Sequence, residues 1–111
     1  MIAFSYAETV TEEMRIVFNS TQATIDFKTT ALTFAIEMSI ACNRFAAMDA
    51  CSGMIKSVSD EGLGMAVAEL IKKYSEHGFI HSIEPTTCSS QAVRNRLSEI
   101  RKAQTTSDDL F

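Results

Sequence analysis

One long apolar stretch, residues 27–58, constrains the fold more than any other part of the chain. It reads FKTTALTFAIEMSIACNRFAAMDACSGMIKSV, with no proline and a single glycine, Gly53. A helix of this composition is apolar on nearly every side, so other elements must cover it. We therefore expect it to form the central element, around which the remaining segments pack.

Helical spacing divides the apolar side chains of this stretch into two stripes on roughly opposite faces. The first stripe recurs at spacings of about four and three residues and comprises Phe27, Ala31, Phe34, Met38, Ala41, Phe45 and Met48. The second comprises Leu32, Ile36, Ile40, Ala47 and Met54. A narrow polar strip between the two contains Thr30, Thr33, Glu37 and Arg44. We expect the rest of the chain to leave part of one apolar face uncovered.

A strand is the alternative interpretation of part of this stretch. From Leu32 to Ile40, apolar residues alternate with smaller or polar ones, and the residues from Ile2 to Tyr6 also alternate. These patterns give a second possible fold, α+β with short strands near residues 2–7, 23–28 and 31–40. The helix is preferred because the alternation fails between Cys42 and Cys51, where alanine and methionine, both strong helix formers, are frequent.

Amphipathic patterns predict further helices on both sides of the central stretch, at residues 5–22, near 61–77 and at 89–103. Thr24 or Asp26 can cap the central helix, Ser59 or Asp60 the next, and Ser89 or Ser90 the last. Gly78 is predicted to end the third helix in a left-handed conformation, with residues 79–83 extended after it. The sequence thus predicts a small all-α bundle of about four helices in one domain, residues 1–103, with a flexible tail at 104–111.

Composition indicates a soluble globular protein. The chain has 111 residues, a net charge of −4 and 46% hydrophobic residues, which suit one domain with its own core. The acidic balance argues against nucleic acid as the partner of the whole domain. The first residues lack the pattern of a signal peptide, and the apolar run is too interrupted to span a membrane. We therefore expect a cytoplasmic protein, no membrane partner, and cysteines that remain thiols.

No motif for catalysis, cofactor binding or metal binding is recognisable. The chain lacks a phosphate-binding loop and a recognisable pairing of a nucleophile with a base. Four possible zinc ligands cluster in the sequence, His77, His81, Glu84 and Cys88, but their spacing matches no standard zinc site. We expect a protein that is not an enzyme and needs no cofactor.

The spare apolar face favours a protein-interaction module. Such a module would act as a regulator, chaperone, inhibitor or adaptor, either as a homodimer or bound to another protein. The candidate surface residues come from both stripes, because the pattern does not decide which face is intermolecular: Phe27, Phe34, Met38, Phe45, Leu32, Ile36 and Ile40.

A small DNA-binding regulator is the alternative function. One polar face of the helix at 89–103 carries side chains that can contact bases and phosphates: Gln91, Arg94, Asn95, Ser98, Arg101 and Lys102. The helix and the amphipathic helix before it resemble helix-turn-helix proteins, but the connector from Gly78 to Cys88 is far longer than the turn of that motif. The competing interpretation is an ordinary solvated face.

The chain ends in an acidic run followed by two apolar residues, Asp108, Asp109, Leu110 and Phe111. This ending resembles the acidic-hydrophobic tails by which replication proteins dock their partners, and the peptides that bind sliding clamps. A docking tail and a disordered terminus both fit the pattern.

Overall fold

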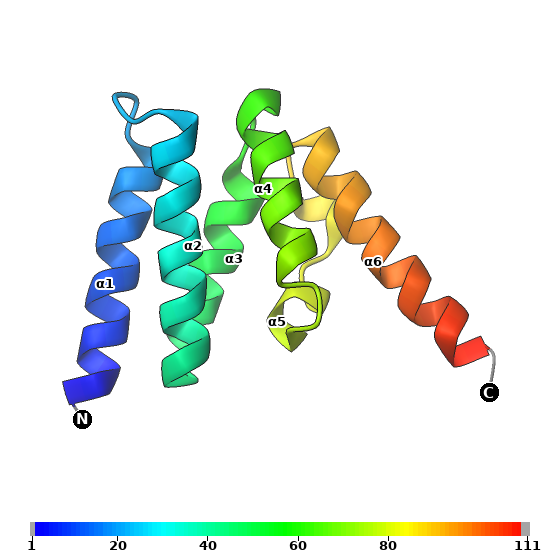
Figure 1. The fold of residues 1–111 in the computed structure, drawn as a ribbon, viewed down its shortest axis with the longest axis horizontal. Helices are drawn as coiled ribbons and strands as arrows, with labels where there is room; N and C mark the ends of the chain where they lie inside the picture. The colour runs from blue at the N-terminus through cyan, green and yellow to red at the C-terminus, as the bar shows by residue number, and fades with distance from the viewer. Residues whose placement is uncertain (1, 110–111) are drawn as a thin grey trace. The chain divides into compact units, whose positions relative to one another are not determined.

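Helices account for all the regular structure in the part of the chain that the structure describes. A computed structural model describes the backbone of residues 2–109 and the side chains of residues 6–103. In chain order its elements are α1 (Ile2–Asn19), α2 (Ile25–Cys42), α3 (Phe45–Ser57), α4 (Glu61–Lys73), α5 (Gly78–His81), the 3₁₀ turn η1 (Pro85–Thr87) and α6 (Gln91–Asp109) (Figure 1). The all-α prediction is confirmed. The α+β alternative is wrong, because residues 2–7, 25–28 and 31–40 are helical.

The chain forms two compact units, residues 1–55 and 56–111. In the first unit, α1 and α2 lie side by side as an antiparallel hairpin (Figure 1). The turn between them ends at Thr24, whose Oγ1 accepts a hydrogen bond from the Phe27 backbone N–H at 3.1 Å. Thr24 is therefore the N-cap of α2, one of the two caps that the sequence predicted.

The central apolar stretch is two helices rather than one. Asn43 adopts a left-handed conformation, with φ 50° and ψ 47°, and ends α2. Its N–H donates to the carbonyl of Ile40 at 3.1 Å, and the N–H of Arg44 donates to that of Ser39 at 3.2 Å. These bonds satisfy carbonyls that a helix end otherwise leaves open. The prediction of one continuous helix is wrong. Asparagine adopts the left-handed conformation at low energetic cost, and the apolar pattern on which the prediction was based continues past Asn43 and does not indicate the break.

In the second unit, α4 begins as predicted but ends earlier. Asp60 Oδ2 accepts a hydrogen bond from the Leu63 N–H at 3.0 Å and caps the helix. The helix ends at Lys73, with Tyr74 as its C-cap. Gly78 is the first residue of α5 and has no positive φ, so its prediction as a left-handed cap is wrong. The extended segment predicted at residues 79–83 is also wrong, since α5 covers most of it.

The last helix packs against α4 (Figure 1). Ser90 Oγ accepts a hydrogen bond from the Val93 N–H at 3.3 Å, which confirms the predicted cap. The buried side chains of this unit include Val67, Ile71, Ile80, Ile83, Val93 and Leu97. The flexible tail at 104–111 stays a prediction; the α6 backbone includes residues up to Asp109, and Leu110 and Phe111 lie outside the described residues.

None of the helices that the structure describes is long and apolar enough to span a bilayer.

Candidate interaction surfaces

The two apolar stripes of α2 have different environments. Leu32 and Ile36 are fully buried, whereas Phe27 and Phe34 keep 59% and 50% of their surface exposed. Phe27 and Phe34 are seven residues apart, about two helical turns, so they project from the same side of α2. Met38 and Ile40 are half-buried. The chain therefore buries Leu32 and Ile36 of the second stripe. It leaves the two phenylalanines of the first stripe, Phe27 and Phe34, largely in solvent, although Ala31 between them is buried.

Phe45 is the most exposed of these aromatic side chains, at 82%. It opens α3 immediately after the break at Asn43 and Arg44. Because the break interrupts the helical repeat, Phe45 does not continue the stripe of Phe27 and Phe34 as the sequence predicted. It is a separate exposed aromatic group in the same unit.

Helix α1 adds an exposed isoleucine beside Phe27. Ile16 is 59% exposed, and it lines a hollow of about 290 Å³ together with Phe27 and four residues at the end of the hairpin, Val17, Ser20, Gln22 and Ala23. A second hollow, of about 500 Å³, lies against Phe27 and is lined also by Gln22, Ala23, Thr24, Asp26 and Thr30. We call the surface formed by Ile16, Ala23, Phe27 and Phe34 the Phe27 face.

Sequence reasoning missed Ile16. The residue falls off the predicted apolar face of α1, which comprises Val10, Met14, Val17 and Phe18. The only available signal was one isoleucine on an otherwise charged side of the helix. A single exposed isoleucine is common on protein surfaces. Ile16 indicates a candidate interaction surface only because the fold places Phe27 beside it.

Two arginines of the first unit, Arg15 and Arg44, pair with glutamates of α1. Arg15, next to Ile16, donates to Glu12, with its Nε 2.9 Å from Glu12 Oε2. The hydrogen bond to Arg15 lowers the pKa of Glu12, and the same contact raises the pKa of Arg15. Arg44 donates to Glu8 Oε1 at 2.6 Å, which ties the break between α2 and α3 to α1.

The buried cysteines are poor nucleophiles. Cys51 is fully buried, with its Sγ 3.9 Å from Ser39 Oγ. Burial raises the pKa of Cys51 to about 11, and burial also raises the pKa of Cys88. Since the thiolate is the reactive form, neither thiol is activated for chemistry near neutral pH. No cluster of three or more potential metal ligands occurs among the described residues.

The arginines of the predicted nucleic-acid face hold the connector that precedes α6. Arg94 Nη1 donates to the carbonyls of Cys88 at 2.8 Å and Ser89 at 3.0 Å. Arg101 Nη2 donates to the carbonyls of His81 at 3.0 Å and Ile83 at 3.2 Å. Both guanidinium groups are thus engaged by the protein itself.

The other members of that face are exposed. Gln91 donates through Nε2 to Asn95 Oδ1 at 2.8 Å, and Ser98 and Lys102 lie at the surface. Arg101 also pairs with Glu84 at 3.0 Å, which adds a negative charge to the same region. DNA binding by this face stays a prediction, and these contacts provide a structural role for its two arginines.

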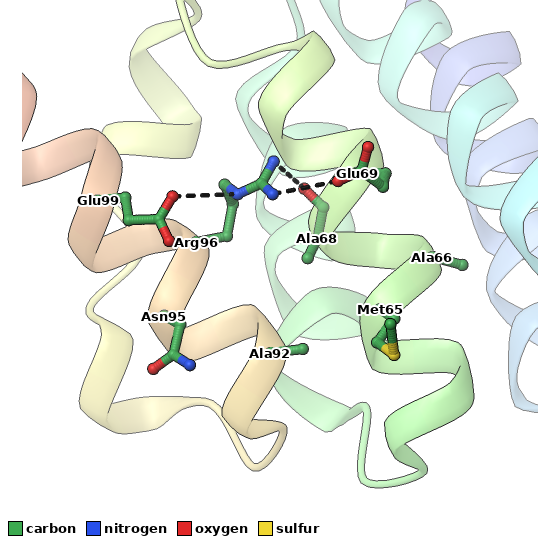
Figure 2. Close-up of a pocket in the computed structure, with 8 residues that line it drawn as sticks. All are labelled: Met65, Ala66, Ala68, Glu69, Ala92, Asn95, Arg96 and Glu99. Atoms are coloured by element: carbon green, nitrogen blue, oxygen red, sulfur yellow. Dashed lines mark hydrogen bonds and ion pairs between the residues drawn. The ribbon is translucent and has the colours of Figure 1, made fainter.

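A groove lies between α4 and α6, with a volume of about 500 Å³ (Figure 2). Three alanines and a methionine form its apolar part, and a polar edge completes it: Met65, Ala66, Ala68 and Ala92, with Glu69, Asn95, Arg96 and Glu99. We call it the α4–α6 groove. No pattern in the sequence indicated this groove, because its residues come from two helices whose pairing was unknown.

The comparisons with known proteins provide no family for this chain. No protein-family model, no curated protein and no solved structure matches it. The docking tail stays a prediction, because the side chains of Asp108 and Asp109 and all of Leu110 and Phe111 lie outside the described residues.

Proposed function

We propose that this protein is a non-enzymatic interaction module that forms a homodimer through its Phe27 face. One observation carries the proposal: α2 buries its Leu32 stripe and exposes half or more of Phe27 and Phe34. Exposed aromatic side chains that cluster on one face are typical of protein–protein contacts. Regulator, chaperone, inhibitor and adaptor remain possible roles for such a module.

The shape of this face favours a second copy as the partner. A symmetric dimer uses the same patch on both subunits, so the patch must fit itself. The Phe27 face carries both a projecting ring, Phe27, and an adjacent apolar hollow lined by Ile16, Val17 and Ala23. The ring of one copy can therefore enter the hollow of the other, and the reverse contact forms at the same time.

The exposed area is compatible with a dimer of modest affinity. Fully burying a phenylalanine removes roughly 200 Å² from water, so the exposed parts of Phe27, Phe34 and Ile16 offer roughly 300 Å² of apolar surface. A typical interface buries about 800 Å² per partner, somewhat more than half of it apolar. The face therefore supplies a large share of the apolar area that such an interface needs.

A complementation experiment tests the fit between ring and hollow. Phe27→Ala removes the ring, which is also one wall of the hollow, and leaves the other walls in place, whereas Ala23→Leu fills the hollow and keeps the ring. Each variant alone should dimerise more weakly than the natural protein. A Phe27→Ala dimer loses both ring contacts, so its affinity should fall by about 1,000-fold if each ring is a hot spot worth about 2 kcal/mol. An equimolar mixture of the two should dimerise better than either alone, because one ring then meets one open hollow.

Light scattering at several concentrations measures these equilibria directly. Met65→Ala is the matched control, since Met65 is a large exposed apolar residue in the other unit; it should leave dimerisation unchanged. A mixture no better associated than the single variants would refute the reciprocal fit. If the natural protein is monomeric alone but binds a different chain through Phe27, the homodimer is refuted. The wider proposal of an interaction module would still hold.

A further inference from the structure

A second surface of this protein, separate from the Phe27 face, has the form of a binding site. Helices α4 and α6 approach closely where both begin, and Figure 1 shows them moving apart along their length. At the close end, a Cβ added to Gly64 would lie 2.1 Å from Ser90 Oγ. Glu61 Oε1 also accepts a hydrogen bond from the Gln91 backbone N–H at 3.1 Å. The helix starts are thus held together, and the α4–α6 groove opens beyond them.

Arg96 spans the groove from α6 to α4 (Figure 2). Its Nη1 donates to the carbonyl of Ala68 at 3.2 Å and its Nη2 to Glu69 at 3.1 Å, while its Nε lies 3.7 Å from Glu99. The Arg96 side chain is only 18% exposed, but those of Glu69 and Glu99 are 72% and 71% exposed. One half-buried cation thus faces two solvated carboxylates, and the edge of the groove keeps a net negative charge.

The rest of the groove is apolar and has small side chains. Ala92 points from α6 toward α4, and Met65 lies across from it on α4 (Figure 2). Met65 is 67% exposed, although the rest of the apolar pattern of α4 is largely buried. Alanines leave room for an incoming side chain, and methionine adapts its shape to what it contacts.

We propose that the α4–α6 groove binds a basic amphipathic segment of a partner protein. An aliphatic side chain of that segment would fill the space between Met65 and Ala92. A lysine or arginine one helical turn away would pair with Glu69 and Glu99. The carboxylates select a cation, because the only cation among the lining residues, Arg96, is already engaged by both of them.

The test uses the full chain, labelled with ¹⁵N, and two synthetic amphipathic helices. One peptide combines leucine with lysine, and the other combines the same leucines with glutamate. The leucine–lysine peptide should shift the amide signals of Ala66, Ala92 and Asn95, and the leucine–glutamate peptide should not. Binding should weaken as salt rises, because the charge pairs lie at the surface.

Variants distinguish binding of the peptide in the groove from its non-specific electrostatic attraction to an acidic protein. Combining Glu69→Gln with Glu99→Gln should weaken binding of the leucine–lysine peptide by roughly three- to tenfold. Glu76→Gln removes an exposed carboxylate that does not line the groove, and it should have no effect. Ala92→Leu should weaken binding more strongly by filling the groove; its spectrum first establishes that the variant folds, and the glutamine variants test the proposal even if it does not.

Three results would overturn the proposal. They are equal binding of the two peptides, an equal effect of Glu76→Gln and the double variant, or shifts confined to residues of the Phe27 face. The first two results leave dimerisation untouched, because light scattering measures it separately. The two proposals can therefore fail independently.

Discussion

Two helical glycines show how the surroundings of a residue determine the effect of its substitution on stability. Gly53, in α3, has nothing within 4 Å of the position a Cβ would occupy, whereas at Gly64, in α4, that position lies 2.1 Å from Ser90 Oγ and 3.1 Å from Ser90 Cβ. Ser90 cannot move away freely, because its hydroxyl caps α6. The two helical glycines should therefore respond in opposite directions to the same substitution.

Gly53→Ala should raise the free energy of unfolding by about 0.5–1 kcal/mol, because alanine is the better helix former. Gly64→Ala should lower it by about 1–3 kcal/mol through overpacking and loss of the cap. Urea denaturation of the two variants beside the natural protein measures both effects. If Gly64→Ala were as stabilising as Gly53→Ala, the close approach of α4 and α6 would be wrong.

The Cys51 thiol should make stability fall at alkaline pH. Its pKa is about 11 in the folded protein and about 8.5 in an unfolded chain. Between these values the unfolded state has lost the proton and the folded state has kept it. Unfolding therefore becomes easier as pH rises, by up to about 1.4 kcal/mol per pH unit from this group.

Urea denaturation between pH 8 and pH 10.5 checks the sign. The natural protein should lose stability with pH more steeply than Cys51→Ala, which lacks the thiol but retains the other groups that titrate in this range. Parallel pH profiles for the two proteins would show that the Cys51 thiol does not hold its proton as described.

At the scale of the elements, the break between α2 and α3 depends on Asn43. Its φ of 50° is unfavourable for most residues and free of penalty for glycine. Asn43→Ala should lower the free energy of unfolding by about 1–2 kcal/mol, and Asn43→Gly should leave it nearly unchanged. Thermal unfolding of both variants distinguishes a break at Asn43 from a continuous helix. In a continuous helix, alanine at this position would stabilise the protein and glycine would destabilise it.

Capping side chains predicted three helix starts correctly, but α1 begins at Ile2 rather than at residue 5, and the start of α3 was not predicted. Thr24, Asp60 and Ser90 cap helices as expected, because a capping side chain acts within three residues of itself. The end of α2 was missed, since Asn43 is one polar residue in an apolar run, and Gly78 was given the wrong role. An apolar pattern also could not show whether the Phe27 stripe or the Leu32 stripe of α2 is buried. Burial depends on which side of α2 packs against α1.

The arginines of α6 should be important for stability. Arg94 and Arg101 together make four hydrogen bonds to backbone carbonyls between residues 81 and 89. Replacing both with alanine should cost about 2 kcal/mol or more, since hydrogen bonds to charged groups are among the stronger ones. Limited proteolysis should then cleave this connector faster, whereas Lys72→Ala, at an exposed basic residue of α4, should leave the cleavage rate unchanged.

The same double variant bears on DNA binding. If the natural protein binds DNA at low salt, and the double variant loses that affinity without losing stability, the arginines contact phosphate rather than the connector. Unchanged proteolysis with lost DNA affinity would therefore contradict the structural role described for Arg94 and Arg101.

At the scale of the whole molecule, the protein has two surfaces suited to partners. The Phe27 face belongs to residues 1–55, and the α4–α6 groove belongs to residues 56–111. The first exposes aromatic side chains, and we propose that it fits a second copy of itself; the second is lined by alanines and has an acidic edge. A module with one surface for its own copy and another for a basic segment would bring two such segments together in one assembly.

The most direct test of the central claim is sedimentation velocity of the natural protein across the micromolar range. The weight-average mass should rise with concentration from that of one chain toward twice that mass, and Phe27→Asp should hold it at one chain. A natural protein that stays monomeric throughout, or a Phe27→Asp variant that associates equally well, would contradict dimerisation through the Phe27 face.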